Sequence, residues 1–131
     1  MPGERVREVG EPQRLPWRPV TIRASYERHP DLGCEAVVFI DDESLSCFQI
    51  QRDLVGSPRH GDGYCVTTGA SAPIYGGAIQ DWRVVDGNRL EFVLGPRAVR
   101  LFGDDTLSFE ITPVGEDTVD DIVAHVERLL D

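Results

Sequence analysis

Most of the chain between residues 20 and 111 consists of short segments in which apolar and polar residues alternate, separated by turn-forming residues. Alternation at every second position is typical of a half-buried strand. The pattern predicts strands over 20–27, 34–41, 45–52, 64–68, 78–85, 89–94 and 107–111. Asp86-Gly87 lies between two such segments and predicts a β-hairpin.

Two helices complete the predicted fold. Pro96 can begin a short helix and Gly103 can end it. The C-terminal segment places apolar residues at helical spacing: Val119, Ile122, Val123, Val126, Leu129 and Leu130. We therefore expect an α+β fold, mainly an antiparallel sheet of about six to seven strands, with one short helix and a C-terminal amphipathic helix.

The chain length of 131 residues suits one domain. Residues 1–19 are rich in Pro and Arg and show no helical or strand periodicity, which predicts an N-terminal arm. Residues 20–131 form the single α+β domain. Trp17 is an expected anchor of the arm.

The sequence predicts a cytoplasmic protein without membrane contact. It contains no run of about 20 apolar residues and no apolar segment typical of a secretory signal near the N-terminus. Its cysteines, Cys34, Cys47 and Cys65, are odd in number and form no CxxC motif, as expected for reduced thiols.

The charge is strongly negative. The formal net charge is −10, and all thirteen basic residues are arginines. Nucleic-acid binding requires a basic face, so this charge argues against a nucleic-acid partner. It suits a basic protein partner, because complementary charge speeds encounter and filters wrong partners. Solubility alone explains the charge equally well.

Catalytic and metal chemistry have little support in the sequence. His60 and Cys65 have no spacing that fixes a nucleophile–base pair, and the scattered histidines and cysteines show no metal-ligand spacing. Neighbouring carboxylates such as Asp41-Asp42 fall at predicted turns, where water solvates them. We expect no catalytic residue, no metal and no cofactor, although the sequence does not decide whether the protein is an enzyme.

Several aromatic and amide side chains on predicted strands and their ends are candidates for a binding face or a pocket. They are Gln49, Gln51, Tyr64, Tyr75 and Trp82, and Trp17 of the arm joins them. A purely structural role for these residues is equally consistent with the sequence.

The segments Phe48-Gln49-Ile50-Gln51-Arg52, Tyr64-Cys65-Val66, Tyr75-Gly76-Gly77 and Leu90-Glu91-Phe92, followed by a short helix ending at Gly103, occur in this order. In this the chain resembles the tenth family of immunity proteins of bacterial polymorphic-toxin systems, over about residues 34–112. The resemblance implies a small protein that binds and neutralises a cognate toxin. It implies no catalytic residue and no cofactor.

The first functional hypothesis is therefore an immunity-protein-like inhibitor that binds a basic toxin domain through an acidic surface. The alternative is a small-molecule-binding protein or a cofactor-free, cyclase-like biosynthetic enzyme. That function requires an internal, mostly apolar pocket, with the arm and Trp17 as its lid. A third hypothesis is a homodimer in which the arm reaches the neighbouring subunit.

Overall fold

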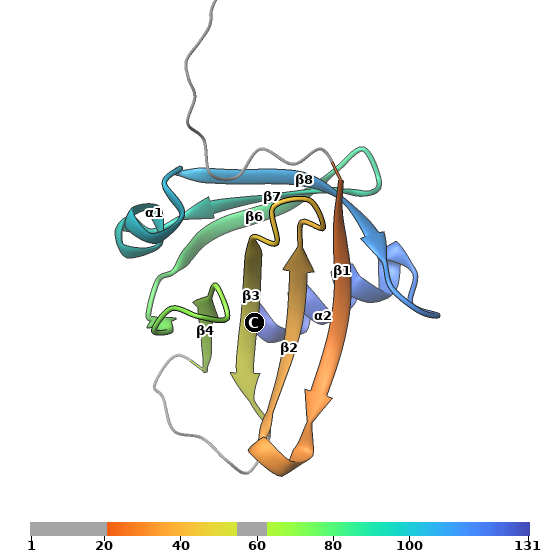
Figure 1. Cartoon of the computed structure of the whole chain (residues 1–131), viewed down its shortest axis with the longest axis horizontal. Helices are drawn as coiled ribbons and strands as arrows, with labels where there is room; N and C mark the ends of the chain where they lie inside the picture. Colours follow the sequence, from red (N-terminus) through yellow and green to blue (C-terminus); the bar gives the residue numbers. More distant parts are fainter. Residues whose placement is uncertain (1–20, 55–62) are drawn as a thin grey trace, which may run out of the picture.

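A computed structural model describes residues 21–54 and 63–131. They form one eight-stranded sheet with two α-helices (Figure 1). The strands are β1 (Thr21–His29), β2 (Cys34–Ile40), β3 (Cys47–Asp53), β4 (Tyr64–Thr67), β5 (Ile74–Tyr75), β6 (Ile79–Val85), β7 (Arg89–Leu94) and β8 (Thr106–Pro113). The helices are α1 (Pro96–Phe102) and α2 (Val119–Leu130), and a single 3-10 turn, η1 (Pro30–Leu32), joins β1 to β2.

The strand order is β5-β4-β3-β2-β1-β8-β7-β6. The α+β class is confirmed, but the prediction of six to seven antiparallel strands is wrong in two respects. The sheet has eight strands, because β5 is only two residues long and too short to show alternation. It is also mixed, because β1 and β8 pair in parallel. These two strands come from opposite ends of the domain, and alternation within a strand carries no information about its neighbours.

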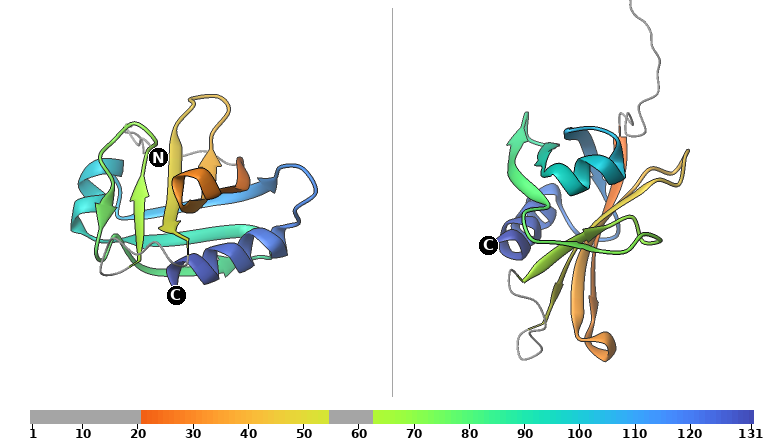
Figure 2. Two further views of the ribbon diagram at one scale, coloured as in Figure 1. Left: turned by 90° about the horizontal axis from the view of Figure 1, so that it is seen from below. Right: turned by 90° about the vertical axis from the view of Figure 1, so that its left-hand side faces the viewer.

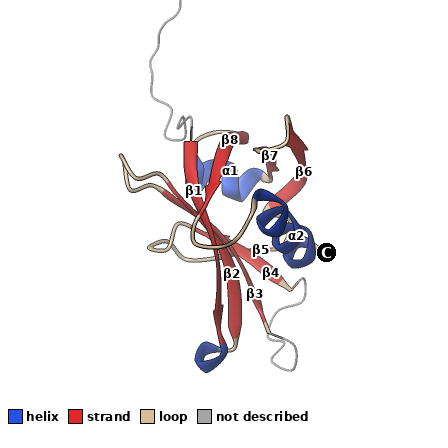
Figure 3. Ribbon diagram, turned by 90° about the vertical axis from the view of Figure 1, so that its right-hand side faces the viewer, coloured by secondary structure: helices blue, strands red, loops and turns tan. Residues whose placement is uncertain are grey.

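The sheet bends sharply where β1 meets β8, so that β6–β8 run across the direction of β1–β4 (Figures 1 and 3). Helix α2 lies on the concave side and packs against β1, β2, β3 and β8. Phenylalanines fill the space between these layers. Phe39 lies 5.2 Å from Phe109 between ring centroids, and Phe48 lies 5.2 Å from Phe92, with all four side chains fully buried.

Several local predictions are confirmed. The 86–88 turn joins β6 to β7, and Asp86 and Gly87 have φ values of 54° and 83°, as in the turns that match strand twist. Helix α1 begins with Pro96 and ends at Gly103, whose φ of 82° is left-handed. Strand β2, which is apolar except for Glu35, is buried along nearly its whole length.

Helix α2 is fixed at both ends. Thr118 and Asp121 form a reciprocal capping box at its start. At its end, Arg52 Nη1 donates to the carbonyl oxygens of Arg128 and Leu129, each at 3.2 Å. These bonds satisfy carbonyls that have no partner inside the helix. Ile122, Val126 and Leu129 form its buried face. No helix in the described ranges is long and apolar enough to cross a membrane.

Candidate functional site

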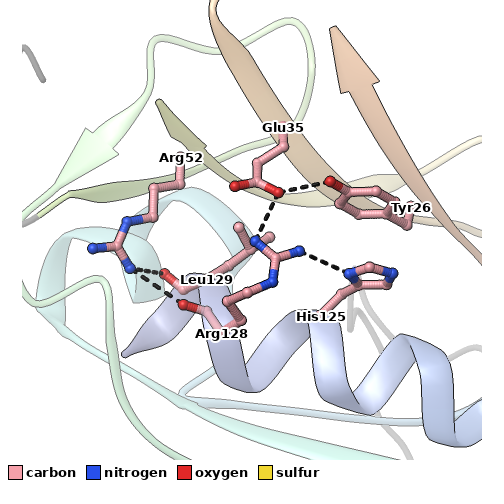
Figure 4. Close-up of polar contacts among 6 residues, drawn as sticks. All are labelled: Tyr26, Glu35, Arg52, His125, Arg128 and Leu129. Atoms are coloured by element: carbon pink, nitrogen blue, oxygen red, sulfur yellow. Dashed lines mark hydrogen bonds and ion pairs between the residues drawn. The ribbon is translucent and has the colours of Figure 1, made fainter. Parts of the chain in front are cut away.

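Four polar side chains meet where the second half of α2 crosses β1 and β2: Tyr26, Glu35, His125 and Arg128 (Figure 4). The Tyr26 hydroxyl donates to Glu35 Oε1 at 2.7 Å, and Arg128 Nη1 donates to the same oxygen at 2.8 Å. The Tyr26 and His125 rings stack at 3.7 Å between centroids with only 4° between their planes. We call these residues the clamp cluster.

The sequence positions these residues through simple periodicities. Glu35 lies on the same face of β2 as Val37 and Phe39, because side chains on one face recur at every second residue. On α2, His125 and Arg128 are three residues apart and therefore share one face of the helix. In the antiparallel register of β1 and β2, Tyr26 is opposite Val37 and Glu35 is opposite Arg28, so Tyr26 and Glu35 are diagonal neighbours two positions apart on one face.

The contacts within the clamp cluster shift the pKa values of Glu35 and Tyr26 away from neutral pH. Burial alone would raise the pKa of Glu35. The hydrogen bonds from Tyr26 and Arg128, together with the charges of Arg128 and Arg28, lower this pKa by more than burial raises it, so the net shift is downward. Burial and the Glu35 carboxylate raise the pKa of Tyr26. Glu35 is therefore ionised and Tyr26 protonated at neutral pH. General acid–base catalysis needs a group that titrates near the working pH, and these two groups do not.

His125 has a defined tautomer in this cluster. Its Nδ1 lies 2.8 Å from Arg128 Nη2, and a guanidinium can only donate. His125 Nδ1 therefore accepts this bond, and the neutral ring carries its proton on Nε2. The cluster ties the end of α2 to the sheet, and its chemistry is that of a structural connection.

A second feature is an open groove of about 430 Å³ on β6, β7 and β8. Its lining residues are Asp81, Trp82, Arg83, Glu91, Val93 and Thr106. Arg83 Nε and Glu91 Oε1 form an ion pair across it at 2.8 Å. A small-molecule function requires an enclosed apolar pocket, and this open, charged groove gives that alternative no support.

The structure distributes the residues predicted as binding candidates over separate places. Gln49 and Gln51 are half-buried on the face of β3 opposite Phe48 and Ile50. Tyr64 packs against the core, and Trp82 stacks on Phe92 at 6.2 Å between ring centroids.

Tyr75, on β5, pairs with Cys65. Its backbone carbonyl and that of Gly76 accept hydrogen bonds from Arg97 Nη2. The carbonyls of the Tyr-Gly-Gly turn therefore hold α1 in place. Trp17 lies outside the described residues.

Sequence reasoning missed the clamp cluster. Tyr26 and Glu35 read as ordinary strand residues, and His125 and Arg128 as the polar side of an amphipathic helix. One signal was present in the sequence: Glu35 is an acidic residue within an otherwise apolar strand. In the structure the exposed fraction of Glu35 is only 8%. A buried carboxylate requires a charged or hydrogen-bonding partner.

The comparisons with known proteins returned nothing. No family model, no curated protein and no solved structure matches this chain.

Proposed function

We propose that this protein binds and neutralises a basic protein partner, as an immunity-protein-like inhibitor of a cognate bacterial toxin domain. One observation carries the proposal. The described arginines are engaged mainly within the protein, whereas ten of the described carboxylates are exposed and have no ion pair.

The engaged arginines fall into two groups. Four form ion pairs with acids of the same chain: Arg23 with Asp42, Arg83 with Glu91, Arg89 with Glu110 and Arg128 with Glu35. Arg52 and Arg97 donate to backbone carbonyls instead. In the described ranges, only Arg28 and Arg100 make no such contact.

The unpaired acids lie mostly at turns and on α2, with Asp81 on β6. Those exposed and without an ion pair among the described residues are Asp31, Glu43, Asp81, Asp86, Asp105, Glu116, Asp120, Asp121, Glu127 and Asp131. Their summed field attracts a basic partner and raises its association rate. The lowered pKa of Glu35 and the raised pKa of Tyr26 also support a binding role over a catalytic one, because neither group titrates near neutral pH.

The test uses the protein encoded by the neighbouring gene. We expect co-expression to protect cells from that protein, and the two chains to elute as one complex in size-exclusion chromatography. The association rate should fall steeply between low and physiological salt, because electrostatic steering is screened. A neighbour that kills cells equally with and without this chain, and that forms no complex, would contradict the proposal.

A further inference from the structure

The turn between β2 and β3, residues 41–46, carries the most exposed of the large apolar side chains that the structure describes. This is Leu45, whose exposed fraction is 76%. A single exposed leucine is common on protein surfaces and by itself means little. Leu45 also has a φ of 61°, in the left-handed region where a β-carbon meets the following carbonyl.

Leucine at position 45 is therefore unfavourable for two reasons: its β-carbon strains the left-handed backbone, and its apolar side chain is exposed to water. Glycine or asparagine adopts the same conformation at lower cost. Asp86, the other non-glycine residue with positive φ in the described ranges, is of a type that tolerates it. The fold of the turn therefore gives no reason for leucine at position 45.

The turn holds Leu45 in one position through hydrogen bonds on both sides. The Leu45 amide donates to the carbonyl of Asp41 at 2.7 Å, and the Asp41 amide donates to the carbonyl of Ser46 at 2.9 Å. The Asp41 carboxylate accepts from the Glu43 amide at 3.1 Å and from Ser44 Oγ at 2.7 Å. A turn whose backbone is held in this way loses little backbone conformational entropy when a partner covers it.

We propose that Leu45 is the apolar anchor of the interface with the basic partner and inserts into an apolar pocket rimmed by basic side chains. This inference rests on the proposed function and names its contact. Asp42 and Glu43 are exposed beside the leucine, and only Asp42 is paired, with Arg23 at 3.0 Å. The turn therefore presents one exposed apolar side chain flanked by negative charges. A second copy of the chain, with its net charge of −10, is repelled by such a turn.

A second ordered loop lies on the same side of the sheet. The β2–β3 turn and the β4–β5 loop both project from the face opposite α2 (Figure 2). Thr67 Oγ1 donates to the carbonyl of Ser71 at 3.1 Å, and the Ser71 amide donates to Thr68 Oγ1 at 3.0 Å. Gly69 of this loop lies over Gln49. Gln49, one of the predicted binding candidates, therefore lies next to the β4–β5 loop.

The test compares Leu45→Asn with Leu32→Asn. Leu32 is a matched control, because it is 67% exposed but lies in η1, at the other end of β2. The probe is the purified protein of the neighbouring gene, with affinity measured by surface plasmon resonance. We expect Leu45→Asn to weaken binding by at least about tenfold, as for an interface anchor, and Leu32→Asn to leave it unchanged. Leu45→Asn should also raise the denaturation midpoint, because asparagine relieves the backbone strain.

Each outcome has one meaning. If the unsubstituted chain binds and Leu45→Asn binds equally well, the anchor is overturned while the proposed function stands. If the unsubstituted chain does not bind, both are overturned. Sedimentation velocity covers self-association: a concentration-dependent dimer that Leu45→Asn abolishes would identify a second copy as the occupant and overturn the basic partner.

Discussion

The hydroxyl of Tyr64 lies 3.3 Å from both the amide nitrogen and the carbonyl oxygen of Ile79. Tyr64 belongs to β4 and Ile79 to β6, which lie near opposite edges of the sheet. The phenol thus accepts from one backbone group and donates to the other, as a neighbouring strand would do. A side chain links the two parts of the bent sheet where no strand ladder joins them.

Tyr64→Phe should lower the free energy of unfolding by about 1–3 kcal/mol, because it leaves the Ile79 amide and carbonyl without this partner. The phenyl ring keeps its packing against the core, so the loss reports the hydroxyl. Urea denaturation measures the stability, and hydrogen exchange of the Ile79 amide measures the local effect. Tyr26→Phe is the control: it removes a hydroxyl that bonds to Glu35, so Ile79 exchange should stay slow. Unchanged Ile79 exchange in Tyr64→Phe would refute the link.

Glu35→Gln should cost about 1–2 kcal/mol of unfolding free energy at neutral pH, since Arg128 is half exposed and solvent screens part of the interaction. The folded-state pKa of Glu35 lies below the ordinary 4.5, so the unfolded chain binds this proton more tightly. The stabilisation is therefore present above about pH 4.5 and is lost as the pH falls through the folded pKa.

Urea denaturation at pH 7 and at successively lower pH measures this dependence. The difference between the unsubstituted chain and Glu35→Gln should shrink on acidification. Glu91→Gln provides the comparison, because its partner Arg83 is 72% exposed and the pair should contribute less than about 1 kcal/mol. A Glu35→Gln difference that grows in acid would show that the sign of the linkage is wrong.

Elements with local signals were predictable from the sequence. The Asp86-Gly87 hairpin, the helix from Pro96 to Gly103 and the amphipathic α2 each follow from neighbouring residues. The parallel pairing of β1 with β8 was not predictable, because it depends on which edges meet in space. The clamp cluster was not predictable for the same reason: Glu35 and Arg128 are 93 positions apart, and no residue near either one indicates that the two side chains meet.

Gly95→Ala should destabilise the fold by about 3 kcal/mol, at the upper end of the cost of overpacking. A β-carbon there would lie 2.1 Å from the carbonyl oxygen of Gly77, which is backbone and cannot rotate away. A backbone shift that removed this clash would also break the hydrogen bond from the Gly95 amide to the carbonyl of Ala78. Gly115→Ala separates sterics from backbone strain: its φ is 75° with no atom within 4 Å, so about 1–2 kcal/mol is expected. Thermal or urea denaturation of both variants shows which one loses more stability. A smaller loss of stability for Gly95→Ala than for Gly115→Ala would contradict the close approach of Gly95 to the Gly77 carbonyl.

Asp81→Ala should make the protein associate at its free edge. Strand β6 is the last strand in the sheet order, and an uncovered edge is a template for pairing with another chain. The Trp82 amide donates to Asp81 Oδ1 at 2.9 Å, so the Asp81 carboxylate occupies a donor that an incoming strand would use. Removing the carboxylate exposes this donor and also lowers the negative charge that keeps chains apart.

Sedimentation velocity over a range of protein concentrations measures this association. Asp105→Ala is the matched control, because Asp105 is an exposed acid whose loss changes the net charge equally but lies outside β6. We expect the Asp81→Ala chain to form dimers or larger species at concentrations where the Asp105→Ala chain stays monomeric. If the two variants associate equally, net charge alone keeps the chains apart. If neither associates, the bond from the Trp82 amide to Asp81 is not what keeps the edge of β6 from pairing with another chain.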